Sequence, residues 1–76
     1  MDMAPVTSSI IHSIGYDRST ETLYIQFLNG SLYEYRHVPV TEHEQLMKAN
    51  SKGTYFNTHI RDLNRYPFNR IRQPCR

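Results

Sequence analysis

Residues 23–35 read Leu23-Tyr24-Ile25-Gln26-Phe27-Leu28-Asn29-Gly30-Ser31-Leu32-Tyr33-Glu34-Tyr35, and this stretch decides the fold. β-Branched and aromatic residues alternate with polar ones on both sides of an Asn-Gly pair, a pattern typical of a β-hairpin. The length of the loop sets the register. A shift of one residue turns every side chain of a strand to the other face.

Two loop lengths fit the Asn-Gly pair. With a two-residue turn at Asn29-Gly30, the tyrosines of the second strand lie on one face of the hairpin and the apolar residues of the first strand lie on the other. A three-residue loop over 28–30 pairs Phe27 with Ser31. All five large residues then share one face: Leu23, Ile25, Phe27, Tyr33 and Tyr35. Because burial favours this gathering, we predict the three-residue loop, with Gly30 in the left-handed position that ends it.

The flanking segments extend this hairpin to an α+β fold. Residues 8–16 predict a strand with isoleucines on both faces, and Gly15 is a candidate bulge. The class is therefore a three-stranded antiparallel meander with two short helices packed on one face. Residues 69–72 fit either a short C-terminal edge strand or an irregular segment.

Two helices are predicted after Val38-Pro39, which ends the third strand. Thr41 and Glu44 have the spacing of a capping box, so the first helix covers about 42–50 and ends at Asn50 in a left-handed conformation. Ser51 is the expected N-cap of the second helix. Its buried face has residues spaced at i, i+3, i+4 and i+7: Phe56, His59, Ile60 and Leu63.

Length and composition predict one small domain. The chain has 76 residues, which we divide into a flexible N-terminal arm (1–7), the domain (8–71) and a basic C-terminal tail (72–76). The sequence has no basic-apolar leader and no apolar run that could span a membrane, so a cytoplasmic location is expected. Cys75 is the only cysteine, which excludes an internal disulfide.

The positive charge is concentrated at the C-terminal end. The net charge is +2, but residues 61–76 hold five of the nine basic residues and only one of the seven acidic ones. All five are arginines, which suit bidentate phosphate contact. The composition, with Tyr66 and Phe68 between the arginines, is that of a nucleic-acid-binding segment or of a solvated basic tail. The candidate contacts are Arg61, Arg65, Arg70 and Arg72.

A second candidate anion site is Ser51-Lys52-Gly53. Free N–H groups at a helix start, a glycine and a lysine suit a phosphate, although the glycine spacing of a Walker A loop is absent. The structural alternative, which we favour slightly, is that Ser51 caps the helix and Gly53 permits a tight approach to the sheet.

The tyrosines of the hairpin have two interpretations. An exposed tyrosine face would stack nucleobases, whereas the predicted register turns Tyr33 and Tyr35 toward the core. We favour the core interpretation. Tyr24 lies on the other face, so the predicted stacking residues are Tyr24, Tyr66 and Phe68.

Nothing in the sequence predicts a cofactor, a metal site or catalysis. No pair among the four histidines (His12, His37, His43 and His59) has the spacing of a helical metal site. No nucleophile elbow or paired-carboxylate pattern is present. We therefore expect a protein that is not an enzyme.

Several segments, taken together in order, resemble the KTSC family. That family is named for a segment at the C-terminus of some lysyl-tRNA synthetases and also occurs as small free-standing proteins. The resemblance covers residues 8–71 and implies no catalytic residues. RNA binding has been suggested for the family largely from the synthetase fusion. The matching segments are Ser8-Ser9, Ile14-Gly15-Tyr16-Asp17, Leu23-Tyr24-Ile25-Gln26-Phe27, Asn29-Gly30, Tyr33-Glu34-Tyr35, Val38-Pro39, Leu46 to Ala49, Ser51-Lys52-Gly53, Tyr55-Phe56-Asn57 and Ile60-Arg61.

These features predict a small non-enzymatic binding module for a phosphate-bearing partner, with RNA as the leading partner. One alternative is a homo-oligomer that sequesters a nucleotide metabolite or signal between protomers. Another is a protein-interaction module that uses an edge strand or the outer sheet face. That face would carry Tyr24, Gln26, Leu32 and Glu34.

Overall fold

The loop between the two central strands has the predicted register. The structure is a computed structural model that describes residues 3–61 and 66–71. Strands β3 (Thr22–Phe27) and β4 (Leu32–Tyr35) pair with Leu23 opposite Tyr35 and Ile25 opposite Tyr33. Three residues form the loop, because the Phe27 N–H donates to the Ser31 carbonyl at 2.8 Å. Gly30 has a φ of 95°, the left-handed conformation that glycine adopts without steric cost.

The sheet has five strands instead of the predicted three plus a short edge strand. β1 (Met3–Pro5), β2 (Ile11–Asp17), β3, β4 and β5 (Phe68–Ile71) lie side by side in chain order, and every neighbouring pair is antiparallel. The prediction of a flexible arm over 1–7 is wrong for Met3–Pro5, whose backbone pairs with β2. The C-terminal edge strand is present and pairs with β4.

A bulge in β2 explains why isoleucines occur at both parities of that strand. The register with β3 shifts between Ile11 and Ser13, so the irregularity lies at His12 and not at Gly15. An extra residue lets side chains of opposite parity turn to the same side. Ile11 and Ile14 are consequently both buried.

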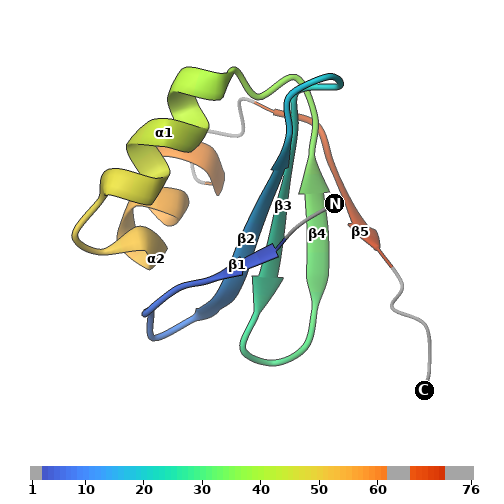
Figure 1. Ribbon diagram of the computed structural model, residues 1–76. Helices are drawn as coiled ribbons and strands as arrows, with labels where there is room; N and C mark the ends of the chain where they lie inside the picture. Colours follow the sequence, from blue (N-terminus) through green and yellow to red (C-terminus); the bar gives the residue numbers. More distant parts are fainter. Residues whose placement is uncertain (1–2, 62–65, 72–76) are drawn as a thin grey trace.

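Both helical segments lie on one side of the sheet (Figure 1). Helix α1 (Val40–Lys48) begins after Pro39, which makes no side-chain cap, so the predicted capping box of Thr41 and Glu44 does not form. The C-cap residue of the helix is Ala49, in an extended conformation, and not Asn50 in a left-handed one. Pro39, in an extended conformation, is itself the N-cap residue, so the first turn of the helix begins before Thr41.

The second helical segment begins as predicted. The Ser51 Oγ accepts from the Thr54 N–H and caps α2 (Lys52–Tyr55), which continues into the π-helix η1 (Phe56–Arg61). Phe56 and Ile60 are buried as expected, whereas His59 is exposed. Leu63 lies outside the described residues. No helix in the described ranges is long and apolar enough to cross a membrane.

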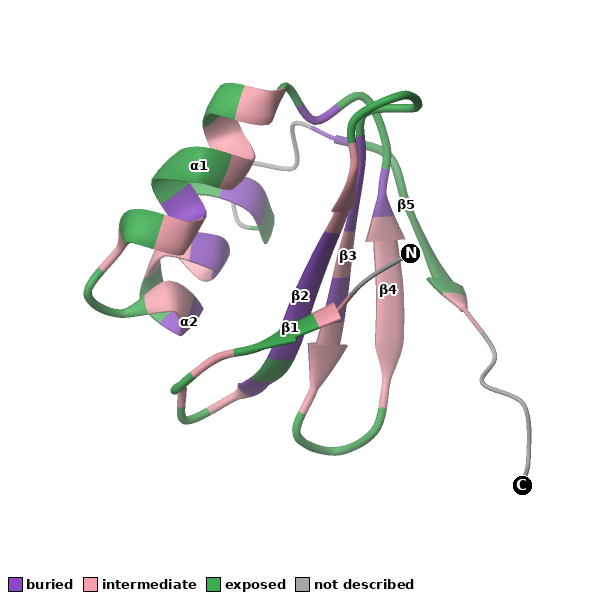
Figure 2. Ribbon diagram, viewed as in Figure 1, coloured by how far each residue is buried: buried purple, intermediate pink, exposed green. Residues whose placement is uncertain are grey.

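The core lies between the helices and the central strands. Buried residues concentrate on β2, β3 and the sheet-facing sides of the helices, while β5 is largely exposed (Figure 2). The cluster of buried hydrophobic residues consists of Ile11, Ile14, Leu23, Ile25, Tyr35, Val38, Leu46, Phe56, Ile60 and Tyr66. The sheet is thus wider than the part that the core covers.

Replacement of Gly30 by alanine should destabilise the hairpin through backbone strain alone. A Cβ at this position meets nothing within 4 Å, so no clash contributes. The left-handed conformation should cost alanine about 1 kcal/mol and lower the Tm by about 4–8 °C, as thermal unfolding would measure. Gly30→Asn should cost less, because asparagine tolerates this region better. A Tm of Gly30→Ala equal to that of the parent protein would contradict the account.

Candidate functional site

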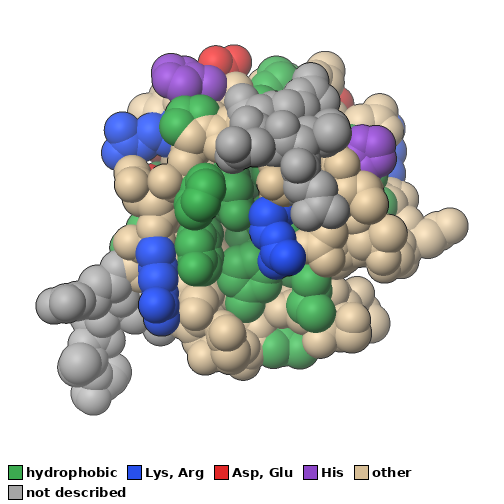
Figure 3. All heavy atoms as spheres, turned by 180° about the vertical axis from the view of Figure 1, so that it is seen from behind, with side chains coloured by type: hydrophobic (Ala, Val, Ile, Leu, Met, Phe, Trp, Pro, Cys, Tyr) green, Lys and Arg blue, Asp and Glu red, His purple; other side chains and the backbone are tan. Residues whose placement is uncertain are grey.

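A groove lies on the helix-facing side of the sheet, toward β4 and β5. Its volume is about 770 Å³. Seen from behind, hydrophobic side chains gather there between Lys or Arg side chains (Figure 3). The groove brings together the β3–β4 loop, the end of η1, β5 and the residues before β2. It is lined by Ser9, Ile10, Phe27, Leu28, Asn29, Ser31, Tyr33, Tyr35, Arg61 and Phe68.

Aromatic rings form the floor of this groove. The Tyr35 ring stacks on Phe68 at 5.4 Å between centroids, and Tyr33 packs edge-on against Phe27 at 5.6 Å. Tyr35 is buried, as the core interpretation predicts, and its ring also contacts Phe56. Tyr33 is only half-buried, and Phe68 is 51% exposed. Part of the predicted core face therefore borders solvent, where a flat ligand can stack.

One arginine lines this groove, and a second, from a distant part of the chain, contacts a lining residue. Arg61, the last residue of η1, contributes to the lining. Arg70 of β5 lies opposite Tyr33 in the register and donates from Nη2 to the Ser31 Oγ at 3.4 Å. Both are exposed. None of the described residues that line the groove carries a carboxylate, so the local charge is positive.

The segment Ser51-Lys52-Gly53 has structural contacts of its own. The Ser51 hydroxyl caps α2, and the Lys52 ammonium donates to the Ala49 carbonyl at 3.2 Å. A Cβ on Gly53 would lie 2.9 Å from the Ile10 side chain, so glycine permits this helix to approach the chain before β2. These residues do not line the groove. Their role as an anion site stays a prediction, and the proposals below do not depend on it.

The predicted stacking residues are divided among three places. Phe68 lies in the groove. Tyr24 lies on the opposite, helix-free face of the sheet, where it pairs with Glu34. Tyr66 is buried, and its hydroxyl donates to Glu42 Oε1 at 3.3 Å, which anchors the chain before β5 to α1. Arg65 and Arg72 lie outside the described residues.

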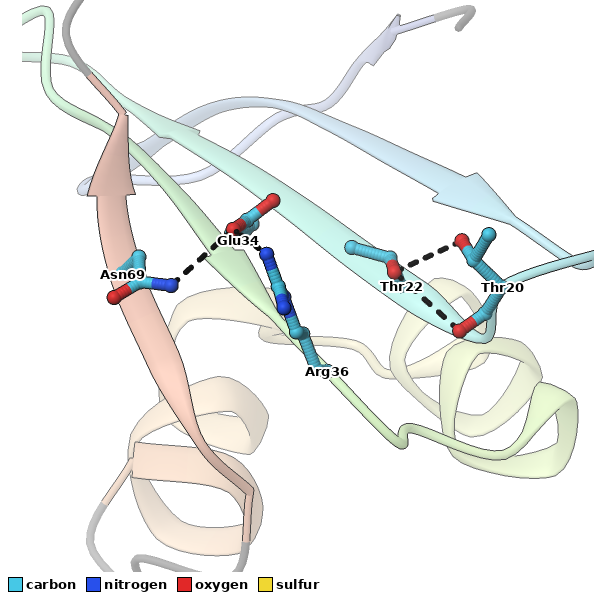
Figure 4. A network of polar contacts seen from close by, with 5 residues as sticks. All are labelled: Thr20, Thr22, Glu34, Arg36 and Asn69. Carbon is cyan, nitrogen blue, oxygen red and sulfur yellow. Dashed lines mark hydrogen bonds and ion pairs between the residues drawn. The ribbon is translucent and has the colours of Figure 1, made fainter.

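The helix-free face of the sheet is polar and largely paired within itself. Glu34 binds Arg36 at 3.0 Å and accepts from Asn69 at 3.4 Å (Figure 4). The Ser13 hydroxyl donates to Gln26 at 3.2 Å. These polar groups of the helix-free face are therefore already paired with one another. Within residues 3–61 and 66–71, no three metal-ligating side chains gather.

Sequence reasoning missed the part of the groove that the hairpin supplies. It assigned Phe27 and Tyr33 to the core and gave Asn29 and Ser31 a role in the loop but none in binding. The predicted register already placed both aromatic residues on one face. The missing information was the position of the helices, which leave the β4–β5 side of that face uncovered.

Burial raises the pKa of the Tyr35 phenol to about 12. Unfolded tyrosine ionises near pH 10, so the unfolded chain loses this proton first. The contribution to stability is therefore complete below about pH 10 and is lost as the pH rises toward about 12. In an absorbance titration of tyrosinate, Tyr35→Phe should lack a component near pH 12, whereas the control Tyr24→Phe should retain it. Superimposable titration curves for Tyr35→Phe and the parent protein would contradict the raised pKa of Tyr35.

Comparisons with known proteins match nearly the whole domain. The family model for the KTSC domain matches residues 7–66. The crystal structure of a KTSC domain protein from Yersinia pestis has a TM-score of 0.84 and 39% identity, over 92% of this chain and 96% of that chain. An uncharacterized protein from Stutzerimonas stutzeri is 37% identical over 57 residues, which cover 75% of this chain and 80% of that protein.

The chain is also similar to part of a much longer protein. A lysine–tRNA ligase from Nostoc sp. is 43% identical over 58 residues. These residues cover 76% of this chain but only 10% of the ligase. The chain thus corresponds to about a tenth of that relative.

Proposed function

Since this chain belongs to the KTSC domain family, we propose that it is a cytoplasmic, non-enzymatic binding module for a phosphate-bearing partner, with RNA as that partner. The groove between η1, the β3–β4 loop and β5 is the proposed binding site. The single observation that carries the proposal is that this groove combines an aromatic floor with Arg61 in its lining and with Arg70, which contacts the lining residue Ser31.

The aromatic floor suits a nucleobase. Half-buried Tyr33 and exposed Phe68 present ring surface that the core leaves uncovered. A base stacked on such a ring gains about 1–3 kcal/mol, with little dependence on its identity. Packing against Phe27 and Tyr35 holds the two rings in place, so a ligand would meet a rigid surface.

The arginines suit the backbone of a nucleic acid. A guanidinium presents donors in a fork that matches two oxygens of one phosphate. Arg61 and Arg70 come from η1 and β5, so phosphates on either side of a stacked base could reach one arginine each. Arg65 and Arg72 remain in the proposal as additional phosphate contacts.

The size of the groove supports a single-stranded ligand. A volume of about 770 Å³ falls in the range of sites that enclose one small molecule. Such a site accepts an unstacked base but not a base pair within a duplex. Sequence-specific proteins commonly bind RNA in this way, through bases splayed out of loops and single strands.

The comparisons support RNA over other phosphate carriers. A domain 43% identical to this chain forms part of a protein named lysine–tRNA ligase. A module carried by such an enzyme has a tRNA within reach.

Removal of both groove arginines should weaken the binding of single-stranded RNA. We expect Arg61→Ala/Arg70→Ala to lower the affinity at least about tenfold, because two charge-assisted contacts are lost. The slope of log K against log salt should become shallower by about 1.4, since each phosphate contact to a single strand contributes about 0.7. Fluorescence anisotropy with a labelled oligonucleotide at several salt concentrations measures both quantities.

Arg18→Ala is the matched control. Arg18 is also an exposed arginine, but it lies in the turn between β2 and β3 and does not line the groove. It should leave affinity and slope nearly unchanged. The control removes one charge and the double variant two, so a control loss of about half the double variant's loss in binding free energy would indicate diffuse charge attraction and contradict a defined groove. Phe68→Ala should weaken binding without changing the salt slope, because it removes stacking and no charge.

Binding measurements with other ligands distinguish the RNA proposal from its two alternatives, a small-ligand function and a protein-interaction module. Tight binding of a mononucleotide or cyclic dinucleotide with weak binding of RNA would replace the RNA proposal with a small-ligand function. Salt-insensitive association with a protein, without retention of nucleic acid, would select a protein-interaction module. Such a partner would cover an edge strand or the outer sheet face that carries Tyr24 and Glu34.

A further inference from the structure

The polar groups at the β3–β4 end of the groove present hydrogen-bond donors. The Asn29 Oδ1 accepts the Ser31 backbone N–H at 2.9 Å. A backbone N–H can pair only with the oxygen of the amide, so this contact identifies Oδ1 and leaves the NH₂ group of Asn29 for a ligand. Asn29 is exposed and lines the groove.

Ser31 also has a hydrogen-bond donor that a ligand can use. Its Oγ accepts from the Arg70 Nη2 at 3.4 Å. A hydroxyl that accepts from a guanidinium still has its own O–H to donate. Arg70 and Arg61 are donors only, since a guanidinium has no acceptor. Four side chains at the groove therefore offer donors to a ligand: Asn29, Ser31, Arg61 and Arg70.

Three nearby backbone acceptors take part in the ladder and the loop. The Phe27 carbonyl accepts from the Gly30 N–H at 3.0 Å, and the Ser31 carbonyl accepts from the Phe27 N–H at 2.8 Å. The Ile10 carbonyl accepts from the Leu28 N–H at 2.9 Å. The ladder and the loop use these three oxygens, and the side chains of Asn29 and Ser31 add hydrogen-bond donors at this end of the groove.

Donors of this kind discriminate between bases at one position. Uracil and guanine carry a keto oxygen, which accepts, where cytosine and adenine carry an amino group, which donates. Phosphate oxygens are acceptors as well. An amino base brought to the Asn29 NH₂ would place donor against donor and lose the hydrogen bond that a keto base gains there.

We propose that the groove selects single-stranded RNA segments with keto bases, uracil or guanine, over segments with cytosine or adenine. The inference rests on the proposed function, because it assumes that a nucleobase stacks on Tyr33 and Phe68. It adds the chemical class of the base and the residues that read it, Asn29 and Ser31.

The experiment compares oligouridylate with oligocytidylate of equal length. The two probes have the same charge and ring size, so backbone contacts cancel in the ratio of their Kd values. We expect the parent protein to bind oligouridylate at least about tenfold more tightly, the discrimination typical of one well-placed base contact.

Asn29→Asp tests the residue that the inference names. The variant keeps an oxygen for the Ser31 N–H, so the loop is preserved, but it replaces the donor NH₂ with an acceptor. The uridine-to-cytidine ratio should fall several-fold, toward or below one. Asn50→Asp is the matched control, because Asn50 is exposed, follows α1 and does not line the groove. It adds the same charge and should keep the ratio of the parent protein. Thermal unfolding of both variants checks that the fold is intact.

The outcomes separate the two proposals. Equal binding of both oligonucleotides, or a ratio unchanged by Asn29→Asp, overturns the base preference and leaves the proposed RNA-binding function standing. Failure of the intact protein to bind either oligonucleotide overturns the proposed function and this inference with it.

Discussion

The hydrogen bonds that close the β3–β4 loop determine the side on which every large residue of the hairpin lies. Phe27 and Ser31 pair across the loop, and Gly30 supplies the left-handed turn. Leu23, Ile25 and the tyrosines of β4 then share one face. A register shifted by one residue would expose half of this set and leave the helices without a surface to cover.

The groove follows from a mismatch in width between two layers. Five strands form the sheet, whereas α1, α2 and η1 cover mainly its central strands. The register carries aromatic side chains beyond the covered part, as far as Phe68 on β5. A small domain has few residues with which to cover such a surface. The uncovered aromatic rings and the nearby arginines form the proposed RNA-binding site.

The N-terminal and C-terminal segments have parallel roles in the fold. Met3–Pro5 and Phe68–Ile71 are both short edge strands, one at each side of the sheet. Both edges are short, one contains Pro5 and the other Arg70, and such edges discourage pairing with other chains. β5 adds more than an edge, because it places Phe68 and Arg70 on the helix-facing side beside Tyr35 and Tyr33. Gly53 also shapes the packing of the helical layer, since its lack of a side chain lets the second helical segment pack closely against Ile10.

The sequence alone determined the hairpin register, the Ser51 cap and the burial of Phe56 and Ile60. Each depends on residues close together in the sequence: the loop length sets the register, a serine hydroxyl caps the helix, and the helical spacing of apolar residues sets the buried face. Local patterns did not predict that Met3–Pro5 would pair with β2, that Pro39 would begin α1, or that Tyr66 would be buried beside Glu42. Only the tertiary structure placed Arg61 and Arg70 at one groove with Tyr33 and Phe68. These residues come from separate elements, and their proximity depends on how much of the sheet the helices cover.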